Sequence, residues 1–484
     1  MLTDEEIRAI YDKGLEAVIA LVRNLLKSFE LQIAVFEARI RQLESQVNQN
    51  SRNSSKPPSS DGLKRTKSQR KKSGKKSGAQ KGHPGHHLEM VDHPDRVEVS
   101  RVTHCKDCGN SLPDEADSVD RRQVFDIPPI KPEVTEYRAE QKTCHTCGAL
   151  NKASFPEGVN QPVQYGPEIK ALATYLNQYQ LIPSERTVEL LQDVFGQQFS
   201  EGSLFAANQA CYEAMESAEE EIKQQILNSP VINCDETGAR VEGKTNWLHV
   251  ASTPELTCYG IYEKRGSDAM DEMGILPFYT GIAKHDSLSP YFKYDNCKHS
   301  LCNEHHLREL TGVIENDKQS WAQQMHDLLL EIKVAVDDQK EESIMHLEPE
   351  QLFKFELSYS RIIGLGYEEN PIFRVWEPAP KAKKRGRPKK TKSRNLLERL
   401  DRRRWETLNF MYDFRVPFTN NQAERDIRMT KVQQKISGGF RSVHGARTFC
   451  RIRGYISTVK KNSAPVLGAI RDALLGTPFI PNRG

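Results

Sequence analysis

The chain has 484 residues, of which 37% are hydrophobic and 28% charged, so we expect about three or four domains and at least one sizeable core. No apolar run is long enough to span a membrane, and the acidic N-terminus, MLTDEEIRAIYDKG, lacks the layout of a signal peptide. These features exclude an integral membrane protein and predict a soluble, cytoplasmic one.

The formal net charge of +3 hides two basic tracts. Residues 62–88 and 381–394 each contain nine Lys or Arg and no acid. Removing these 18 from the 69 basic residues leaves 51 against 66 acidic residues, so the rest of the chain is acidic. Such tracts are typical of contacts to a polyanion, and solvation of two linkers is the alternative. The candidate polyanion-binding residues are Lys71, Lys72, Lys75, Lys76, Arg385 and Arg387.

Residues 1–48 are predicted to form a coiled-coil helix, which Thr3 and Glu6 begin with a capping box. We expect self-association through its apolar seam, and packing of the helix on the protein's own body is the alternative. The next segment, NQNSRNSSKPPSSDG, is polar and has nothing to bury, so residues 49–88 are predicted to be a disordered basic linker. The apolar seam of the predicted coiled-coil helix follows alternating steps of four and three: Leu15, Ile19, Val22, Leu26, Phe29, Ile33, Phe36, Ile40, Leu43 and Val47.

Residues 89–160 contain two CxxC pairs, Cys105 with Cys108 and Cys144 with Cys147. Each pair is followed by Gly, and 35 residues separate the pairs. Four thiolates at this spacing hold one tetrahedral Zn²⁺, so we predict a structural zinc ribbon rather than a redox pair. Either neighbouring histidine, His104 or His145, is an alternative to one thiolate. The other cysteines are scattered, as is typical of a reducing compartment: Cys211, Cys234, Cys258, Cys297, Cys302 and Cys450.

Residues 161–228 read as a helical region. SERTVELLQDVFGQQFSEGSLFAANQACYEAM predicts a helix, a turn at Gly196 and a second helix capped near Ser200. This pattern fits a DNA-binding helix-turn-helix and equally a helical hairpin in a core. The second helix, Ser203 to Met215, contains no Arg or Lys, so we favour a structural or phosphate-positioning role over base reading.

From residue 229 to 312 the alternation predicts five short strands, the last running into a helix, and therefore a mixed α/β sheet. Asp235 follows the run VINC, and Asp286 follows IAKH. A carboxylate just past a buried strand projects into the crevice at the sheet edge, where ligands commonly bind. Taken singly, Asp235 has the alternative of capping a turn, and Asp286 that of starting a helix.

The stretch PFTNNQAERDIR supplies a third acid, Glu424, after the helix-starting residues Thr419, Asn420 and Asn421. An exposed ion pair with Arg428, four residues on, is one interpretation of Glu424. Together with the two strand-end aspartates, however, it makes the oxygen ligand set that Mg²⁺ prefers. Two Mg²⁺ (or Mn²⁺) ions roughly 3.5–4 Å apart support phosphodiester chemistry. Three basic residues beside Glu424 would then hold phosphates: Arg425, Arg428 and Lys431.

Nearly end to end, the chain resembles a transposase of the insertion sequence 66 family, a DDE-type group. The matching segments are NSSKPPSSDG, KKSGAQKGHPGH, the two CxxC pairs, ERTVELLQDVFG, DETGARV, CNEHHLREL, VPFTNNQAERDIRMTKVQQKISGGFRS and FCRIRGYISTVKK. The resemblance implies an RNase H-like core over residues 229–312 and 408–484, with Asp235, Asp286 and Glu424 as its acidic triad. Asp295 lies close to Asp286 in the sequence and is the alternative for the second aspartate of the triad. The CNEH motif resembles a C/D-x-x-H signature of several DDE groups.

The 138 positions from Asp286 to Glu424 exceed what one strand and helix require, so residues 313–407 are interpreted as a helical insertion. Its KKRGRPKK tract resembles an AT-hook, whose arginines enter a narrow minor groove, and a disordered basic loop is an equal alternative. Four further residues have a spacing that permits a second zinc site, although HSLCN also reads as a buried strand, which we favour. They are Cys297, His299, Cys302 and His305.

The function implied is a DNA transposase that cleaves a phosphodiester at each transposon end and joins the exposed 3′-OH to target DNA. The implied partners are double-stranded DNA, a second copy of the chain and accessory proteins encoded by the same element, in the cytoplasm at a bacterial nucleoid. One alternative is a structure-specific nuclease of RNase H-like fold, and another is a non-catalytic DNA-binding protein derived from a transposase.

Overall fold

The computed structural model describes residues 4–54, 61, 88–128, 130–196, 198–371 and 390–482. Residues 62–87 and 381–389 of the two basic tracts lie outside the described residues. The chain divides into two compact units. The first comprises Met1–Ser68, Gln161–Val188 and Ser200–Gly484, and the second Gln69–Asn160 and Glu189–Phe199.

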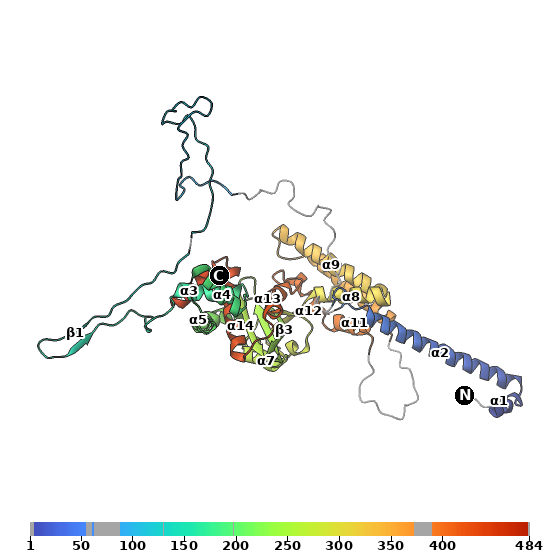
Figure 1. Cartoon of the computed structure of the whole chain (residues 1–484). Helices are drawn as coiled ribbons and strands as arrows, with labels where there is room; N and C mark the ends of the chain where they lie inside the picture. The colour runs from blue at the N-terminus through green and yellow to red at the C-terminus, as the bar shows by residue number, and fades with distance from the viewer. Residues whose placement is uncertain are drawn as a thin grey trace. The chain divides into compact units, whose positions relative to one another are not determined.

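A five-stranded mixed sheet lies at the centre of the first unit, in the order β5-β4-β3-β6-β7 (Figure 1). Neighbouring strands are antiparallel from β5 to β3 and parallel from β3 to β7. All five predicted strands are present, and β7 runs into a helix as expected. Their bounds are β3 Val231–Val241, β4 Lys244–Ser252, β5 Thr257–Tyr262, β6 Ile282–His285 and β7 Lys298–Leu301.

Helices cover both faces of this sheet. Because side chains alternate along a strand, the even-numbered residues of β3 pack with α6 and α7, and the odd-numbered ones pack with α13 and α14. The face that α13 covers is therefore the face that carries Asp235. The bounds of these helices are α6 Glu216–Leu227, α7 Ser267–Met273, α13 Asn421–Ser437 and α14 Val443–Lys461.

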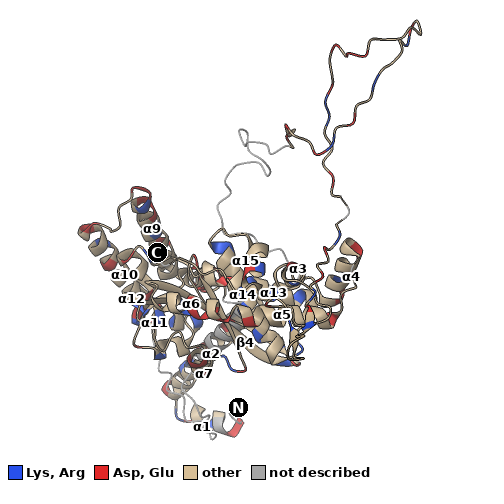
Figure 2. Ribbon diagram, turned by 90° about the vertical axis from the view of Figure 1, so that its left-hand side faces the viewer, with Lys and Arg blue, Asp and Glu red and all other residues tan. Residues whose placement is uncertain are grey.

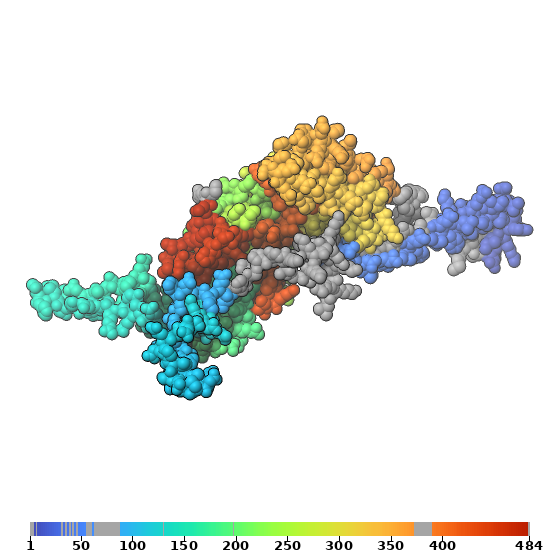
Figure 3. All heavy atoms as spheres, turned by 90° about the horizontal axis from the view of Figure 1, so that it is seen from above, coloured from blue at the N-terminus to red at the C-terminus, as the bar shows by residue number. Residues whose placement is uncertain are grey.

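The region predicted as an insertion is helical. Helices α8, α9 and α10 pack together as one contiguous body, yellow to orange in Figure 3. Buried Trp321, Tyr359 and Leu397 belong to its core, and Gly366 lets Leu397 approach the helix backbone, since a Cβ there would lie 2.5 Å from a Leu397 methyl group. The helices are α8 Asn303–Asp317, α9 Ser320–Glu341, α10 Pro349–Glu369, α11 Lys392–Arg402 and α12 Arg404–Tyr412.

The helical region before the sheet shares a core with the C-terminal helices. Ser200 caps α5 as predicted, since its Oγ accepts the Ser203 N–H at 3.0 Å. Buried Cys211 and Met215 then pack with Ile452 and Tyr455 of α14, which supports the structural interpretation of this helix over base reading. The remaining helices here are α3 Pro167–Thr174, α4 Ser184–Phe195, α5 Glu201–Ala214 and α15 Val466–Leu474, with a π-helical turn at Tyr175–Tyr179.

Two helices, α1 (Asp4–Tyr11) and α2 (Leu15–Val47), occupy the N-terminal segment. A break at Gly14, whose φ is +94°, separates them, whereas the sequence predicts no interruption. Thr3 of the predicted capping box lies outside the described residues. The seam of α2 is exposed along most of its length, from Leu15 (74%) to Val47 (83%), so the described chain does not cover it.

The polar segment after α2 makes contacts, and the prediction that it has nothing to bury is wrong for residues 51–54. Asn53 is buried, and its Nδ2 donates to Glu315 Oε2 on α8 at 3.0 Å. Arg52 also pairs with Glu315. The Asn53 carbonyl lies 2.4 Å from where a Cβ at Gly312 would be, so only glycine permits this approach.

The second unit contains a short antiparallel hairpin of β1 (Gln141–Thr143) and β2 (Leu150–Lys152). Residues 88–160 carry both signs of charge along their length (Figure 2). None of the helices within the described ranges has the length and apolar character needed to cross a bilayer.

Candidate functional site

Asp235 and Asp286 occupy matching positions on neighbouring parallel strands. The last paired residues of β3 and β6 are Asn233 and Lys284, and each aspartate follows two residues later. Asp235 lies within β3, on the face that α13 covers, whereas Asp286 lies just past the end of β6, and its charge acts on both Asp235 and Glu236. Asp286 ends its strand as predicted. Asp235 does not, because β3 continues as the partner of β4 as far as Val241.

Main-chain hydrogen bonds hold one oxygen of each aspartate. Asp235 Oδ1 accepts the Glu236 N–H at 2.9 Å, and Asp286 Oδ1 accepts the Leu288 N–H at 2.9 Å. Both residues are only partly buried. These bonds fix the orientation of both carboxylates.

Glu424 approaches the same face from the first turn of α13. Asn420 stands at the N-cap, but its side chain does not cap the helix as the sequence predicts. Its Nδ2 donates instead to the Cys234 carbonyl of β3 at 2.8 Å, and its own N–H donates to Cys302 Sγ at 3.2 Å. The start of α13 is thus tied to β3 and to the start of α8.

The three carboxylates are within electrostatic reach of one another. Burial, then the charge of Glu236, and then the charges of Asp286 and Glu424 raise the pKa of Asp235 well above 3.8. Glu424 Oε1 is buried and has no hydrogen-bond partner among the described residues. Repelling carboxylates with an unpaired oxygen are the donor set that a divalent cation satisfies, so these residues fit Mg²⁺ or Mn²⁺.

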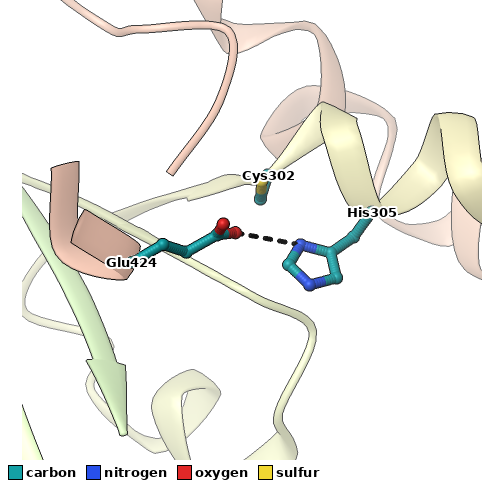
Figure 4. A group of neighbouring side chains, drawn as sticks. All are labelled: Cys302, His305 and Glu424. Atoms are coloured by element: carbon teal, nitrogen blue, oxygen red, sulfur yellow. Dashed lines mark ion pairs between the residues drawn. The ribbon is translucent and has the colours of Figure 1, made fainter. Parts of the chain in front are cut away.

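A tighter cluster joins Glu424 to Cys302 and His305, whose side chains point toward one another in Figure 4. The ligand atoms of these three residues all lie within 4.8 Å of one another. His305 Nδ1 and Glu424 Oε1 are 3.9 Å apart, and neither has a hydrogen-bond partner in the described chain. An unpaired buried polar atom costs about 1–3 kcal/mol, so this pair calls for a physical explanation. Asp235 and Asp286 are not members of this cluster.

Cys302 and His305 shift each other's pKa. Burial alone lowers the pKa of His305, but Cys302 and then Glu424 outweigh it and raise that pKa to about 9. Burial alone raises the pKa of the Cys302 thiol, but His305, then Lys284 and the Asn420 N–H lower it overall. Each of these two residues therefore stabilises the charged form of the other.

The four residues considered for a second zinc site are not brought together. Cys297 is buried in the core beneath the sheet, and its thiol donates to the Tyr294 carbonyl at 3.4 Å. His299 Nδ1 faces His285 Nε2 at 3.0 Å. Only Cys302 and His305 of the four belong to the cluster with Glu424.

The basic residues of α13 differ in their surroundings. Arg425 and Arg428 are exposed, and Arg425 Nε donates to the Asn421 carbonyl at 3.2 Å. Lys431 is also exposed, but its ammonium donates to the Gly238 carbonyl of β3 at 2.9 Å, and partial burial lowers its pKa. Lys431 therefore anchors the helix. The other predicted phosphate-binding residues lie outside the described residues: Lys71, Lys72, Lys75, Lys76, Arg385 and Arg387.

Sequence reasoning missed a buried ion pair that supports Glu424. Lys461 Nζ and Asp426 Oδ2 are 2.8 Å apart, with 11% and 8% of their side chains exposed. Lys461 also donates to the Thr253 and Leu256 carbonyls. Asp426 stands two residues after Glu424, so this pair fixes α13 against the β4–β5 turn. No local sequence pattern indicates this ion pair, because Asp426 and Lys461 are far apart in the sequence.

The opposite face of β3 carries a second polar group that the sequence did not reveal. The Glu236 side chain is fully buried and accepts from Arg265 Nη2 at 2.6 Å and from the Tyr291 hydroxyl at 2.7 Å. Nearby on β6, the buried Lys284 ammonium donates to the Leu301 carbonyl at 2.8 Å, and burial lowers its pKa to about 8. These groups brace the strands that carry the two aspartates.

The two CxxC turns are each formed as predicted. The Cys105 N–H donates to the Asn110 carbonyl at 2.9 Å, and the Cys144 N–H to the Ala149 carbonyl at 2.8 Å. Hydrogen bonds from the backbone N–H groups of Cys147 and Thr146 lower the pKa of Cys144 to about 7, which favours the thiolate. Within the described ranges, the four sulfur atoms are not gathered into one cluster. Four thiolate donors nonetheless fit Zn²⁺, whose binding is coupled to folding.

Residues 162–448, more than half of the chain, match the model of the transposase IS66 family. This range contains Asp235, Asp286, Glu424 and the Cys302–His305 pair. Residues 103–148 match the zinc-finger binding domain of transposase IS66, which supports a structural Zn²⁺, and residues 5–89 match a family of unknown function, DUF6444. No curated protein matches the chain. The matches support a transposase with DNA as its partner, and the chain belongs to the transposase IS66 family.

Proposed function

We propose that the chain is a DDE-type transposase that cleaves and joins DNA, with Asp235, Asp286 and Glu424 as its acidic triad. The observation that carries this proposal is the matched register of the two aspartates on neighbouring parallel strands, beside the sheet face that α13 covers. Glu424 enters from the first turn of that helix, and its charge acts on Asp235. Three acids from three separate segments then share one surface.

The proposed fold of the catalytic core is RNase H-like. Its support is the mixed sheet, whose antiparallel half carries Asp235 and whose parallel half ends at Asp286. The helical insertion would separate Asp286 from Glu424 along the chain without separating them in space. The core would comprise residues 229–312 and 408–484, interrupted by 313–407.

The triad would hold two Mg²⁺ or Mn²⁺ ions. Such ions, when bound roughly 3.5–4 Å apart, activate an attacking oxygen and stabilise the leaving one. Asp235 would be the shared ligand, because both other carboxylates act on its pKa. Asn420 would orient the helix that carries Glu424 through its bond to the Cys234 carbonyl.

DNA phosphates would be bound by the exposed Arg425 and Arg428 beside Glu424 and by the two basic tracts. Affinity from such contacts falls as salt is added. The proposed reaction is hydrolysis of a phosphodiester at each transposon end, followed by attack of the exposed 3′-OH on a target phosphodiester.

Two transposon ends must meet in one complex, and we assign this to a coiled coil of α2 with a second copy. Phe29 and Phe36 of the seam are 59% and 66% exposed, at spacing that fits a partner helix. Accessory proteins of the same element would complete the complex, in the cytoplasm at the nucleoid.

The test uses purified chain, the accessory proteins of the element and labelled DNA carrying its terminal repeats, with Mg²⁺ or Mn²⁺. Wild type and the surface control Glu368→Gln should produce 3′-end cleavage and joined products, and Glu424→Gln should lose both. Nicking of generic branched DNA without joining would instead identify a nuclease. End-specific binding without cleavage by any of these proteins would identify a non-catalytic DNA-binding protein.

A further inference from the structure

Two helix starts meet beside the proposed triad. Cys302 is the N-cap of α8, and Asn420 is the N-cap of α13. The Asn420 N–H donates to Cys302 Sγ at 3.2 Å, and the Asn303 N–H donates to the Phe418 carbonyl at 3.1 Å. These bonds fix the two helices relative to each other, so the side chains of their first turns meet in one place.

Three ligand-type side chains fill that place: Cys302, His305 one turn into α8, and Glu424 in α13 (Figure 4). Their ligand atoms lie within 4.8 Å of one another, and His305 Nδ1 is 3.9 Å from Glu424 Oε1. Bonds of about 2.0–2.3 Å to a tetrahedral Zn²⁺ place its ligand atoms roughly 3.3–3.8 Å apart. A small movement of the three side chains toward one another would therefore bring their ligand atoms to the spacing that Zn²⁺ requires.

The facing atoms of His305 and Glu424 make no hydrogen bond that would prevent them from binding a metal ion. His305 Nδ1 and Glu424 Oε1 are both buried, and neither has a hydrogen-bond partner in the described chain. At 3.9 Å they are too far apart for a hydrogen bond to each other. They form a long ion pair when His305 is protonated, and a cation bound between them would satisfy both atoms when it is neutral.

We propose that Cys302, His305 and Glu424 bind a Zn²⁺ ion, separate from the zinc of the CxxC pairs. A thiolate and an imidazole suit Zn²⁺ and not Mg²⁺, which takes oxygen ligands. Three protein ligands leave the fourth position of the ion open, as in catalytic rather than structural zinc sites. Through Glu424 Oε1 the ion would tie α13 to α8, leaving the second carboxylate oxygen for the hard-metal site.

Cys297 and His299, although close in sequence, are outside this site. The Cys297 thiol donates to the Tyr294 carbonyl, and His299 pairs with His285. Cys297 is nevertheless a buried cysteine five residues from Cys302, which makes Cys297→Ser a matched control.

The first experiment counts zinc in the purified full-length chain after growth with added zinc. We expect two ions per chain in wild type and in Cys297→Ser, and one in Cys302→Ser and in His305→Ala. The Cys144→Ser, Cys147→Ser double variant should also retain one. One ion in wild type, unchanged in Cys302→Ser, would overturn the proposal. The count needs no DNA, so it is independent of the proposed transposase activity.

Cobalt substitution reports on the ligands directly and protects the test against misfolded variants. Added to the metal-free chain in which Cys105, Cys108, Cys144 and Cys147 are all changed to Ser, Co²⁺ should give a thiolate charge-transfer band that is weaker than that of the intact chain, because only one of the five thiolate ligands remains. Cys302→Ser on this background should abolish the band, and Cys297→Ser should keep it. A band that survives Cys302→Ser, or its absence from the chain that lacks the four CxxC cysteines, would contradict the site.

Discussion

Asp235 and Asp286 lie at the same register of two parallel strands, each two residues beyond the Asn233–Lys284 pair. The parallel pairing of β3 and β6 therefore brings the two aspartates to the same end of neighbouring strands, where the charge of Asp286 acts on Asp235. The third carboxylate, Glu424, comes from a helix that Asn420 ties to β3. The three carboxylates thus depend both on backbone pairing of the strands and on a side-chain bond that holds α13.

The first prediction concerns the metal-free protein. Asp235→Asn should stabilise it at neutral pH by about 0.5–2 kcal/mol, as replacements of strained site residues do. Burial and the neighbouring carboxylates raise the pKa of Asp235 above 3.8, so its contribution to stability is present below the unfolded-state pKa and is lost as the pH rises through the folded-state pKa.

Urea unfolding in EDTA at about pH 4 and about pH 7 measures this effect. The gain in the Asn variant should be small at the lower pH and larger at the higher one. A variant less stable than wild type at neutral pH would mean that Asp235 is not held among repelling carboxylates.

The buried pair of Asp426 and Lys461 should matter for stability. Lys461→Met leaves a buried carboxylate without its cation, so we expect a loss of about 3–5 kcal/mol. The double variant Asp426→Leu, Lys461→Met should recover most of that loss in urea unfolding. Equal stability of wild type and Lys461→Met would show that the pair does not hold α13.

Two basic residues of α13 should behave differently toward DNA. Arg428 is exposed, so Arg428→Ala should weaken binding to every sequence and reduce the slope of log affinity against log salt by about 1. The Lys431 ammonium is bound to the Gly238 carbonyl, so Lys431→Met should lower stability and leave the slope nearly unchanged. Fluorescence anisotropy over a salt series measures both, and equal slopes for the two variants would contradict this assignment.

The α2 seam should mediate self-association. Phe29→Glu with Phe36→Glu places charge on the exposed seam and should convert the protein to a monomer in sedimentation velocity. Lys27→Glu, on the same helix but off the seam, should not. If the double variant keeps the sedimentation coefficient of wild type, the protein self-associates through a surface other than the seam.

The strands are predictable because their signals are local. Alternation defines β3 and β4, and the turn at Glu242 and Gly243 joins them, with φ of +50° and +75°. The place of Asp235 within β3 does not follow from the sequence in the same way. Asp235 lies inside β3 because β4 continues to pair with β3 as far as Val241. The residues of β3 alone do not indicate how long its partner strand is.

Long-range contacts account for the rest of what the sequence leaves open. The docking of Asn53 on Glu315 spans 262 positions, and side-chain amide bonds of this kind leave no periodic signal. The same holds for Glu424 and the CNEH motif. Each is recognisable alone, but only the folded chain brings Cys302, His305 and Glu424 within 4.8 Å.

The measurement that tests the acidic triad most directly compares Asp286→Asn with Asp295→Asn in the joining assay. Asp286 acts on the pKa of Asp235, whereas the exposed Asp295 is not among the groups that do. We predict that Asp286→Asn lowers the joining rate by about a thousandfold or more, as loss of a central catalytic group does, and that Asp295→Asn leaves it within about twofold. Loss of joining in Asp295→Asn with full activity in Asp286→Asn would contradict the triad.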